Sequence, residues 1–369
     1  MLPHIHVQSM GFVEFMREVL PSYELKSPRT IKRTILKMYV VVRQLIISYL
    51  ALEDCHCSIT FDGWSNRALS TFYLVTLHWV SPESAKPMSM LLDFLHVFPG
   101  EGGGKRCGLA LFRHLKSFGL GSRLFYTISD NGSDTIVASK ELGKLLYEIY
   151  NHDIFPSSHM LRCIVHTFQL GVKAALENIS ASTYKLRNLI DFIHSSKVKR
   201  VVFKKFARTM YEHGEQDPPF LDCPTRWNST LEMYKDVLKV KNILLYTMFE
   251  HKSNNEFGGE MPSDDDWNHI IGMVKWLECP SRMSTYLGGS KYPTLSVVVL
   301  AFTRLLSHCN QYVGIDVESI ESHSLRITTQ VQQEASEKCL GYLIKYQESC
   351  KSIPSRIAKF LDPRYVKIF

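Results

Sequence analysis

The stretch LFYTISDNGSD, residues 124–134, decides the fold. Its first six residues are rich in apolar, aromatic and β-branched side chains, which is typical of a strand. Asp130 follows directly, and Ser133 or Asp134 can then cap a helix that runs to about Tyr150. A strand that passes through an acidic turn into a helix indicates an α/β fold.

A second acid occupies a similar place earlier in the chain. Asp62, in CSITFDGWS (57–65), also follows an apolar, β-rich run. Two carboxylates at the ends of neighbouring strands can hold a divalent cation, and a pair of such cations can activate a water or a 3′-hydroxyl against a phosphodiester. The alternative is that Asp62 and Asp130 are turn residues, because Asp forms local hydrogen bonds in turns.

Three further strands are predicted before residue 124. They are Ser58–Phe61, Phe72–Val80 and Met88–Val97. Their local connections favour antiparallel neighbours, and the nearly continuous apolar character of the middle run favours a sheet covered by helices on both faces. A helix is expected from Gly102–Gly104 to about Ser117, and a last strand at Met160–Val165. This order predicts an α/β fold of the ribonuclease-H-like kind, with a mixed sheet of about five strands.

Helices are predicted on both sides of this region. Ser27 can cap a helix that begins at Pro28 and extends to about Leu52. Apolar residues at near-helical spacing predict one buried face, made of Ile31, Ile35, Met38, Val42, Leu45 and Tyr49. Past His166 the sequence is predicted to be almost wholly helical. The expected divisions are a helical segment, 1–56, a sheet-containing core, 57–166, and a helical domain, 167–369.

The composition excludes several classes of protein. The chain has 369 residues, a net charge of +7, 45% hydrophobic and 21% charged residues, which is typical of a folded globular protein. Nine cysteines without a CxxC pair argue against a disulfide framework and fit a reducing compartment. The apolar stretches have the length of strands and the start lacks the features of a secretory signal, so no membrane span is expected.

Six short motifs occur along the chain in one order. They are FDGWS (61–65), SDNGSD (129–134), RCIVHTFQL (162–170), CPTRWNST (223–230), SKYPTLS (290–296) and FLDPRY (360–365). In order and approximate spacing they resemble the hAT (hobo/Activator) transposase superfamily, over nearly the whole chain. The resemblance implies a transposase-derived protein, related to zinc-finger BED proteins, whose ribonuclease-H-like catalytic core is split by a large helical insertion domain, here 167–369.

The resemblance also implies roles for single residues. Asp62 and Asp130 match the first two members of the family's metal-binding acidic triad, with Mg²⁺ or Mn²⁺ as the ancestral cofactor. Cys163 and His166 match a C-x-x-H feature near the start of the insertion domain. A four-coordinate zinc would need further ligands that the nearby spacing does not supply, so a structural role is favoured and zinc is not expected.

The motif CPTRWNST contains a candidate nucleic-acid contact. Trp227, preceded by Arg226, resembles the insertion-domain tryptophan on which some transposases of this family stack a flipped base. A large aromatic face compensates for lost base stacking, and a neighbouring guanidinium can meet phosphate. The alternative is a tryptophan in the core of the helical domain, because Trp is buried on average in most proteins.

A basic segment points to nucleic acid independently of the resemblance. HSSKVKRVVFKKFAR (194–208) contains no acid. On a helix, one face carries Lys197, Arg200, Lys204 and Arg208. The opposite side, expected to contact the core, carries Val198, Val202 and Phe206. The functional interpretation is contact with DNA phosphates, and the alternative is a solvated helix face.

Two features of the family are missing from this sequence. The third acid of the triad, a glutamate, follows the LDPR motif in the family, whereas here the last glutamate is Glu348 and the chain ends at Phe369. Residues 1–50 contain no cysteine and therefore no zinc finger. The favoured interpretation is a transposase-derived DNA-binding protein, truncated at both ends, without the C-terminal catalytic and dimerisation segment and catalytically inactive.

Two alternatives stay open. One is an active metal-dependent transposase or nuclease, if the gene model is incomplete or if Asp93 or Glu141 supplies the third acid. The other is a domesticated DNA-binding regulatory or interaction protein. In each case the predicted partner is DNA, either transposon ends or DNA without sequence specificity, and the predicted location is the nucleus. Self-association stays open, and neither a membrane nor a small-molecule substrate is expected.

Overall fold

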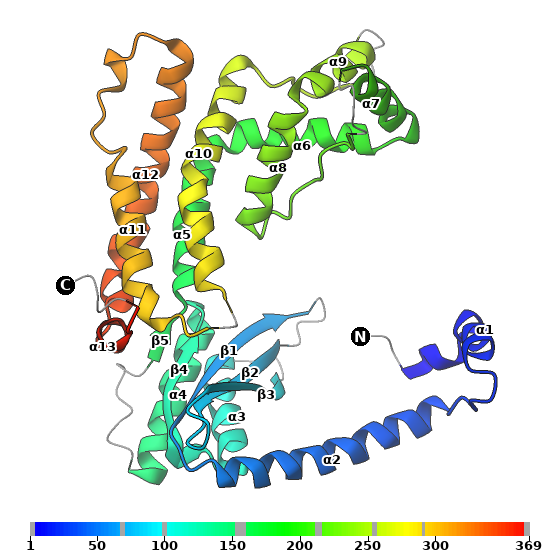
Figure 1. Cartoon of the computed structure of the whole chain (residues 1–369), viewed down its shortest axis with the longest axis vertical. Coiled ribbons are helices and arrows are strands. Elements are labelled where there is room, and N and C mark those ends of the chain that lie inside the picture. Colours follow the sequence, from blue (N-terminus) through cyan, green and yellow to red (C-terminus); the bar gives the residue numbers. More distant parts are fainter. Residues whose placement is uncertain are drawn as a thin grey trace. The chain divides into compact units, whose positions relative to one another are not determined.

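The chain forms two compact units, Met1–Leu161 and Arg162–Phe369 (Figure 1). The structure is a computed structural model that describes residues 4–66, 71–97, 102–151, 160–210, 216–252, 257–289 and 292–364. The first unit contains nearly all of the sheet, and the second is helical. The division into three parts that the sequence suggests stays a prediction.

The first unit begins with the 3-10 helix η1 (His4–Gln8), α1 (Met10–Val19) and α2 (Pro28–Leu52). The start and the end of α2 are as predicted. Its N-cap is Ser27, whose side chain accepts a hydrogen bond from the backbone N–H of Thr30 at 3.2 Å. Pro28 stands in the first turn, where a missing N–H leaves no bond unmade.

The prediction that the apolar stripe of α2 is buried is wrong. In this fully described helix Leu50 is the one buried residue, and the apolar stripe that includes Met38 and Leu45 is exposed. The helix contacts the rest of the unit through another side. The guanidinium of Arg43 lies 4.3 Å from the ring centroid of Phe118, and Arg123 donates a hydrogen bond to the carbonyl of Leu50 at 2.9 Å. Helical spacing identified an apolar stripe but not the surface that it faces.

α2 also bears on the expectation that every apolar stretch is short. Among the described residues it is the one helix long and apolar enough to cross a membrane, by length and composition alone. Core helices of soluble proteins meet the same test, so the observation is weak. The expectation that every apolar stretch is as short as a strand is nevertheless wrong. The mean hydropathy of α2 stays high although Lys37 and Arg43 interrupt its apolar residues.

The sheet has five strands within the described residues, in the order β3-β2-β1-β4-β5. The strands are β1 (Cys57–Ser65), β2 (Thr71–Val80), β3 (Pro87–Val97), β4 (Leu124–Ser129) and β5 (Met160–Arg162). β2 pairs antiparallel with both β1 and β3, and β1 pairs parallel with β4. These pairings confirm the predicted mixed sheet.

One face of β2 is buried within the first unit, and not both faces as predicted. Tyr73, Val75 and Leu77 are buried, whereas Phe72, Leu74 and Thr76, which alternate with them, are half-buried. The alternation was hidden in the sequence because the side chains on the open face are also apolar.

Two helices cover the buried face of the sheet. α3 (Gly103–Ser117) and α4 (Ser133–Tyr150) share one core cluster with the strands. The two helices approach closely where α3 carries glycine, since a Cβ on Gly108 would lie 2.6 Å from the carbonyl oxygen of Ala138. The start of α4 lies near the carboxyl end of β4 because only three residues separate the two elements.

The second unit is a set of helices with one continuous hydrophobic core. They are α5 (Ile164–Leu176), α6 (Ser180–His194), α7 (Lys197–Met210), α8 (Trp227–Lys239), α9 (Lys241–Lys252), α10 (Asp264–Leu287), α11 (Val298–Asn310), α12 (His323–Cys350) and α13 (Ile353–Leu361). α5, α10 and α11 pack against α12 (Figure 1). These helices agree with the prediction that the chain past His166 is almost wholly helical.

Candidate functional site

Asp62 and Asp130 lie at matching positions on neighbouring parallel strands. β1 and β4 pair as far as Thr60 opposite Ile128, and the same offset carried two residues further sets Asp62 beside Asp130. Asp62 does not end its strand, as the sequence suggested, because β1 continues beside β2 to Ser65. The two acids therefore share one edge of the β1–β4 ladder, although only Asp130 follows the end of its own strand.

The carboxylate of Asp130 is engaged in the first turn of α4. Its Oδ1 accepts a hydrogen bond from the hydroxyl of Thr135 at 2.5 Å and one from the backbone N–H of Gly132 at 3.1 Å. The cap expected from Ser133 or Asp134 is not formed, because the N-cap is Gly132, without a side-chain cap. Thr135 was missed in the sequence, where its distance of five residues from an acid is a weak signal.

A hollow of ≈ 230 Å³ opens beside Asp130. It is lined by Gly63, Trp64, Ser65, Thr71, Tyr73, Asp130, Gly132, Ser133, Asp134 and Thr135. Asp130 and Asp134 are its two acidic groups among the described residues. Asp62 is exposed and is not one of the described residues that line it.

Tyr73 lines this hollow, and Cys107 lies next to its phenol. Burial raises the pKa of the Tyr73 phenol, and the neighbouring Cys107, Asp134 and Asp130 raise it further. Burial likewise raises the pKa of the Cys107 thiol to about 12. Both groups are therefore protonated at neutral pH, so the negative charge of the hollow comes from its carboxylates.

The described residues do not fit a preformed centre for two divalent cations. No group of three or more His, Cys, Asp or Glu side chains within the described ranges is placed to hold a metal ion. One oxygen of Asp130 already accepts two hydrogen bonds. The alternative third acids lie elsewhere, since Asp93 pairs with His114 and Glu141 packs against α3 at Gly108.

Cys163 and His166 lie at the start of α5, both half-buried. Cys163 is the N-cap residue, and its carbonyl accepts hydrogen bonds from the backbone N–H of Thr167 at 3.1 Å and from the Thr167 hydroxyl at 3.3 Å. These contacts support the start of the helix. Across the described part of the chain, no third or fourth ligand joins the pair.

Trp227 begins α8 and lies in the core of the second unit with 4% of its surface exposed. Arg226 directly before it is exposed. A hollow of ≈ 270 Å³ borders this region, lined among others by Trp227, Arg187 and Tyr234. The face of the tryptophan is thus covered by protein in this structure.

A buried ion pair that the sequence did not reveal holds the CPTRWNST segment. Nε and Nη2 of Arg187 donate to the two carboxylate oxygens of Asp222 at 2.8 and 2.7 Å, and Thr230 donates to the same carboxylate at 2.5 Å. Burial opposes the ionisation of Asp222, but these donors outweigh it and lower its pKa. Asp222 precedes the motif directly, which is the signal that could have identified it.

The face of the basic helix α7 that packs against the core differs from the predicted face. Phe203 and Ala207 are buried, whereas Val198, expected to contact the core, is 68% exposed. Among the predicted cations, Lys204 pairs with Asp217 at 2.7 Å. Four cations of α7 form no ion pair with any residue that the structure describes. Lys199 contacts the Ser195 hydroxyl and the Phe192 ring, and the other three are Lys197, Arg200 and Lys205.

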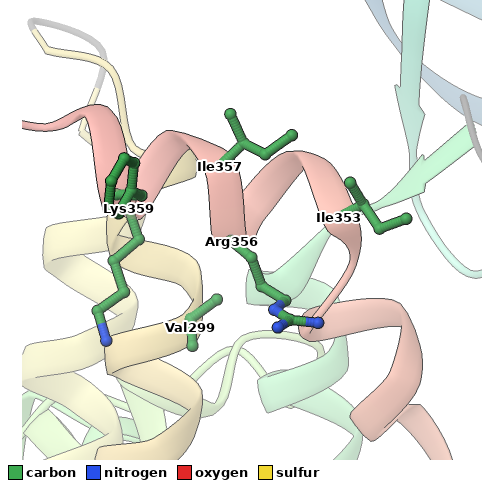
Figure 2. Close-up of a pocket in the computed structure, with 6 residues that line it drawn as sticks. Val299, Ile353, Arg356, Ile357 and Lys359 are labelled. Atoms are coloured by element: carbon green, nitrogen blue, oxygen red, sulfur yellow. The ribbon is translucent and has the colours of Figure 1, made fainter.

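A larger hollow, ≈ 590 Å³, lies along α13. It is lined by Val299, Ile353, Arg356, Ile357, Lys359 and Phe360. In Figure 2, Arg356 and Lys359 extend from α13 toward the side where Val299 lies. This hollow contains no carboxylate among its described lining, so it is not a candidate metal site.

Comparisons with known proteins match both the helical unit and the chain as a whole. The family model of the ZBED1 RNase-like helical domain matches residues 161–275. The AC and AC9 transposases of Zea mays are each 23% identical over 98% of this chain, covering 43% and 44% of their own lengths. The human zinc finger BED domain-containing protein 6 is 25% identical over 98% of this chain and 36% of its own.

The chain therefore spans less than half the length of each of these relatives. The matched model lies on the helical unit, and the relatives align through the sheet as well. Together with the six motifs, these matches support descent of the chain from a transposase of the hAT type, to which it is similar along nearly its whole length.

Proposed function

We propose that this protein binds DNA without cleaving it, through the basic face of α7. The observation that carries the proposal is the set of unpaired cations on that helix. α7 contains no acidic residue, and Lys197, Arg200 and Lys205 form no ion pair with the described residues. Cations that are left unpaired by their own fold are available to phosphate groups.

The seating of α7 supports this use of the helix. Phe203 and Ala207 are buried against the unit, and Lys197, Arg200 and Lys205 are exposed. Because the buried residues fix the rotation of the helix, its cations are held toward solvent rather than free to fold inward. Contacts of this kind bind the DNA backbone and carry no base sequence, so we propose binding without strong sequence preference.

The proposed lack of cleavage rests on Asp62 and Asp130. Asp130 accepts hydrogen bonds from Thr135 and Gly132 in the turn before α4, and Asp62 is exposed and is not one of the described residues that line the hollow beside Asp130. We propose that these acids are the remains of an ancestral Mg²⁺ or Mn²⁺ site. A nuclear location follows from the proposed DNA partner.

Salt-dependent DNA binding tests the proposed interface. The variant K197Q/R200Q/K205Q should bind a short duplex more weakly, and the slope of log K against log salt should fall by about 0.9 for each lost contact. The control K116Q/K140Q/K338Q removes the same charge from exposed positions of α3, α4 and α12. If both variants weakened DNA binding equally, the loss would come from the change in net charge and not from α7, and the proposal would be overturned.

A nicking assay tests the proposed lack of cleavage. Supercoiled DNA incubated with the purified chain and Mg²⁺ or Mn²⁺ should stay intact. Nicking that D62A abolishes would show an active centre and would contradict the proposal. Because D62A leaves α7 unchanged, binding should persist in that variant.

A further inference from the structure

The outer side of α13 carries a short apolar stripe. Ile353, Ile357 and Phe360 follow one another at intervals of four and three residues, so they share one face of the helix. Their exposed fractions are 69%, 52% and 76%. The stripe is therefore largely open to solvent, although its residues are among the most apolar of the second unit.

The opposite side of α13 attaches the helix to its unit. The buried hydroxyl of Ser355 donates a hydrogen bond to the carbonyl of Cys350 at 2.9 Å. Just beyond the end of the helix, Arg364 donates to the hydroxyl of Ser296 at 3.3 Å. Because these contacts hold the helix near both ends, its rotation is fixed and the apolar stripe is kept outward.

The hollow beside this stripe is positively charged. Arg356 and Lys359 extend from α13 toward the side where Val299 of α11 lies (Figure 2). Neither cation forms an ion pair with a residue that the structure describes, whereas Arg364 nearby pairs with Asp362 at 2.6 Å. α11 and α13 contain no acidic residue. The two helices that flank the hollow therefore supply positive charge and nothing to neutralise it.

We propose that this hollow docks an acidic amphipathic helix of a partner protein. Apolar side chains of the partner pack against Ile357 and Phe360, and its carboxylates pair with Arg356 and Lys359. The length of the stripe fits such a helix, since residues 353 to 360 span about 10 Å, the rise of about two helical turns. The partner is thus recognised by apolar residues at helical spacing with Glu or Asp beside them.

The charge and the shape of the hollow oppose other occupants. A second copy of α13 would place its own Arg356 and Lys359 against the same cations, and like charges at an interface oppose pairing. DNA could contact the cations but would leave the apolar stripe in water. A bilayer offers a flat surface, whereas a recess of ≈ 590 Å³ between two helices accepts single side chains.

Two synthetic peptides test the docking on the full chain. Both are fluorescein-labelled helices of about 16 residues with leucine at alternating intervals of three and four residues. One carries glutamate beside the leucines and the other carries lysine, with alanine elsewhere. Fluorescence anisotropy should show the glutamate peptide binding with a Kd below about 100 μM, and the lysine peptide binding at least about 10-fold more weakly.

Charge reversal shows whether the binding belongs to α13. R356E/K359E should bind the glutamate peptide at least about 10-fold more weakly than the wild type does, and should bind the lysine peptide more tightly. The control K116E/K140E reverses two exposed cations of α3 and α4 and should leave both affinities unchanged. The exchange of preference between the two peptides is the result that a merely unfolded variant could not give.

The apolar stripe is tested separately. I357S/F360S should weaken binding of the glutamate peptide by about 10-fold or more, because the partner's leucines lose their contacts. Both residues are exposed, so circular dichroism should show unchanged helix content. This variant and R356E/K359E should bind a DNA duplex as the wild type does, because neither changes α7. The docking and the proposed DNA binding can therefore fail independently.

Three outcomes would overturn the proposal. The first is a glutamate peptide that does not bind at about 100 μM. The second is an equal loss of binding in R356E/K359E and K116E/K140E, which would trace the binding to net charge. The third is a wild-type chain that ignores both peptides but sediments with vesicles of phosphatidylcholine and phosphatidylserine, and that I357S/F360S releases, which would assign the stripe to a lipid surface.

Discussion

The hydroxyl of Thr135 donates a 2.5 Å hydrogen bond to Oδ1 of Asp130, across the turn that joins β4 to α4. The acid that we propose to be a remnant of a metal site thus also holds the start of a helix. Removal of the Asp130 side chain is therefore expected to lower the stability of the first unit, whether or not this residue takes part in a reaction. Experiments on this site must therefore separate the stability of the first unit from its activity.

Removing the side chain of Asp130 should destabilise the protein. D130A removes the acceptor of the Gly132 N–H and leaves the Thr135 hydroxyl only the carbonyl oxygens of Gly132 and residue 130, which should lower the free energy of unfolding by about 1 kcal/mol, as for a lost helix cap. D130N retains an acceptor oxygen and should lose less. Urea unfolding measures both changes.

Asp62 provides the matched comparison for that experiment. It is exposed, and D62A should change the free energy of unfolding by less than about 0.5 kcal/mol. If D130A proved as neutral as D62A, the hydrogen bonds of Asp130 would not stabilise α4, and a purely ligand role for this acid would be favoured.

Truncation of Trp227 should act mainly on stability. The side chain is 4% exposed in the core of the second unit, so W227A should lower the free energy of unfolding by about 3–5 kcal/mol. W227F keeps most of the volume and should be milder. A W227A variant that unfolds like the wild type but binds unpaired DNA less tightly would instead support a base-stacking role.

The close approach of α3 and α4 makes Gly108 sensitive to a single methyl group. A Cβ there would lie 2.6 Å from the carbonyl oxygen of Ala138 and 2.7 Å from Cβ of Glu141, so G108A should cost about 1–3 kcal/mol of stability through overpacking. Thermal or urea unfolding of the purified variant measures this cost.

Gly341 is the control for that substitution. It lies inside α12 and has nothing within 4 Å of the added Cβ. G341A should therefore raise stability by about 0.5–1 kcal/mol, because alanine favours a helix more than glycine does. Two stabilising substitutions would show that α3 and α4 are not held as closely as the structure has them.

Local signals predicted most elements of the fold. The Ser27–Pro28 pair predicted the start of α2, and the β-branched run before Asp130 predicted β4 at Leu124–Ser129 with the correct bounds. Such signals act through the backbone of a few neighbouring residues, so they can be read from the sequence directly.

Features that depend on distant partners could not be predicted in this way. Near-helical spacing on α2 identified an apolar stripe, but the actual contacts of Arg43 and Leu50 with the unit depend on Phe118 and Arg123, about seventy residues further along the chain. The same holds for the pairing of Arg187 with Asp222, in which neither residue belongs to the motif that it supports.

Acid should weaken the second unit through Asp266. This residue closes the capping box of α10 with Ser263 and also accepts hydrogen bonds from Ser182 at 2.6 Å and Lys185 at 3.1 Å. Burial opposes its ionisation, but the donors from Ser182, Ser263 and Lys185 outweigh it and lower the pKa to about 2. The charged form of this carboxyl group is therefore more stable in the folded protein than in the unfolded chain.

The sign of the pH dependence follows from that shift. An unfolded aspartate has a pKa of about 3.9, so the contribution of Asp266 is fully present above about pH 4 and is lost as the pH falls through the folded value of about 2. The loss should be on the order of 2 kcal/mol, measured by urea unfolding at several pH values in this window. D266N should flatten the dependence, whereas D264N, at an exposed residue of the same turn, should leave it unchanged. Equal slopes for all three proteins would mean that the hydrogen bonds of Asp266 do not discriminate between its charged and neutral forms.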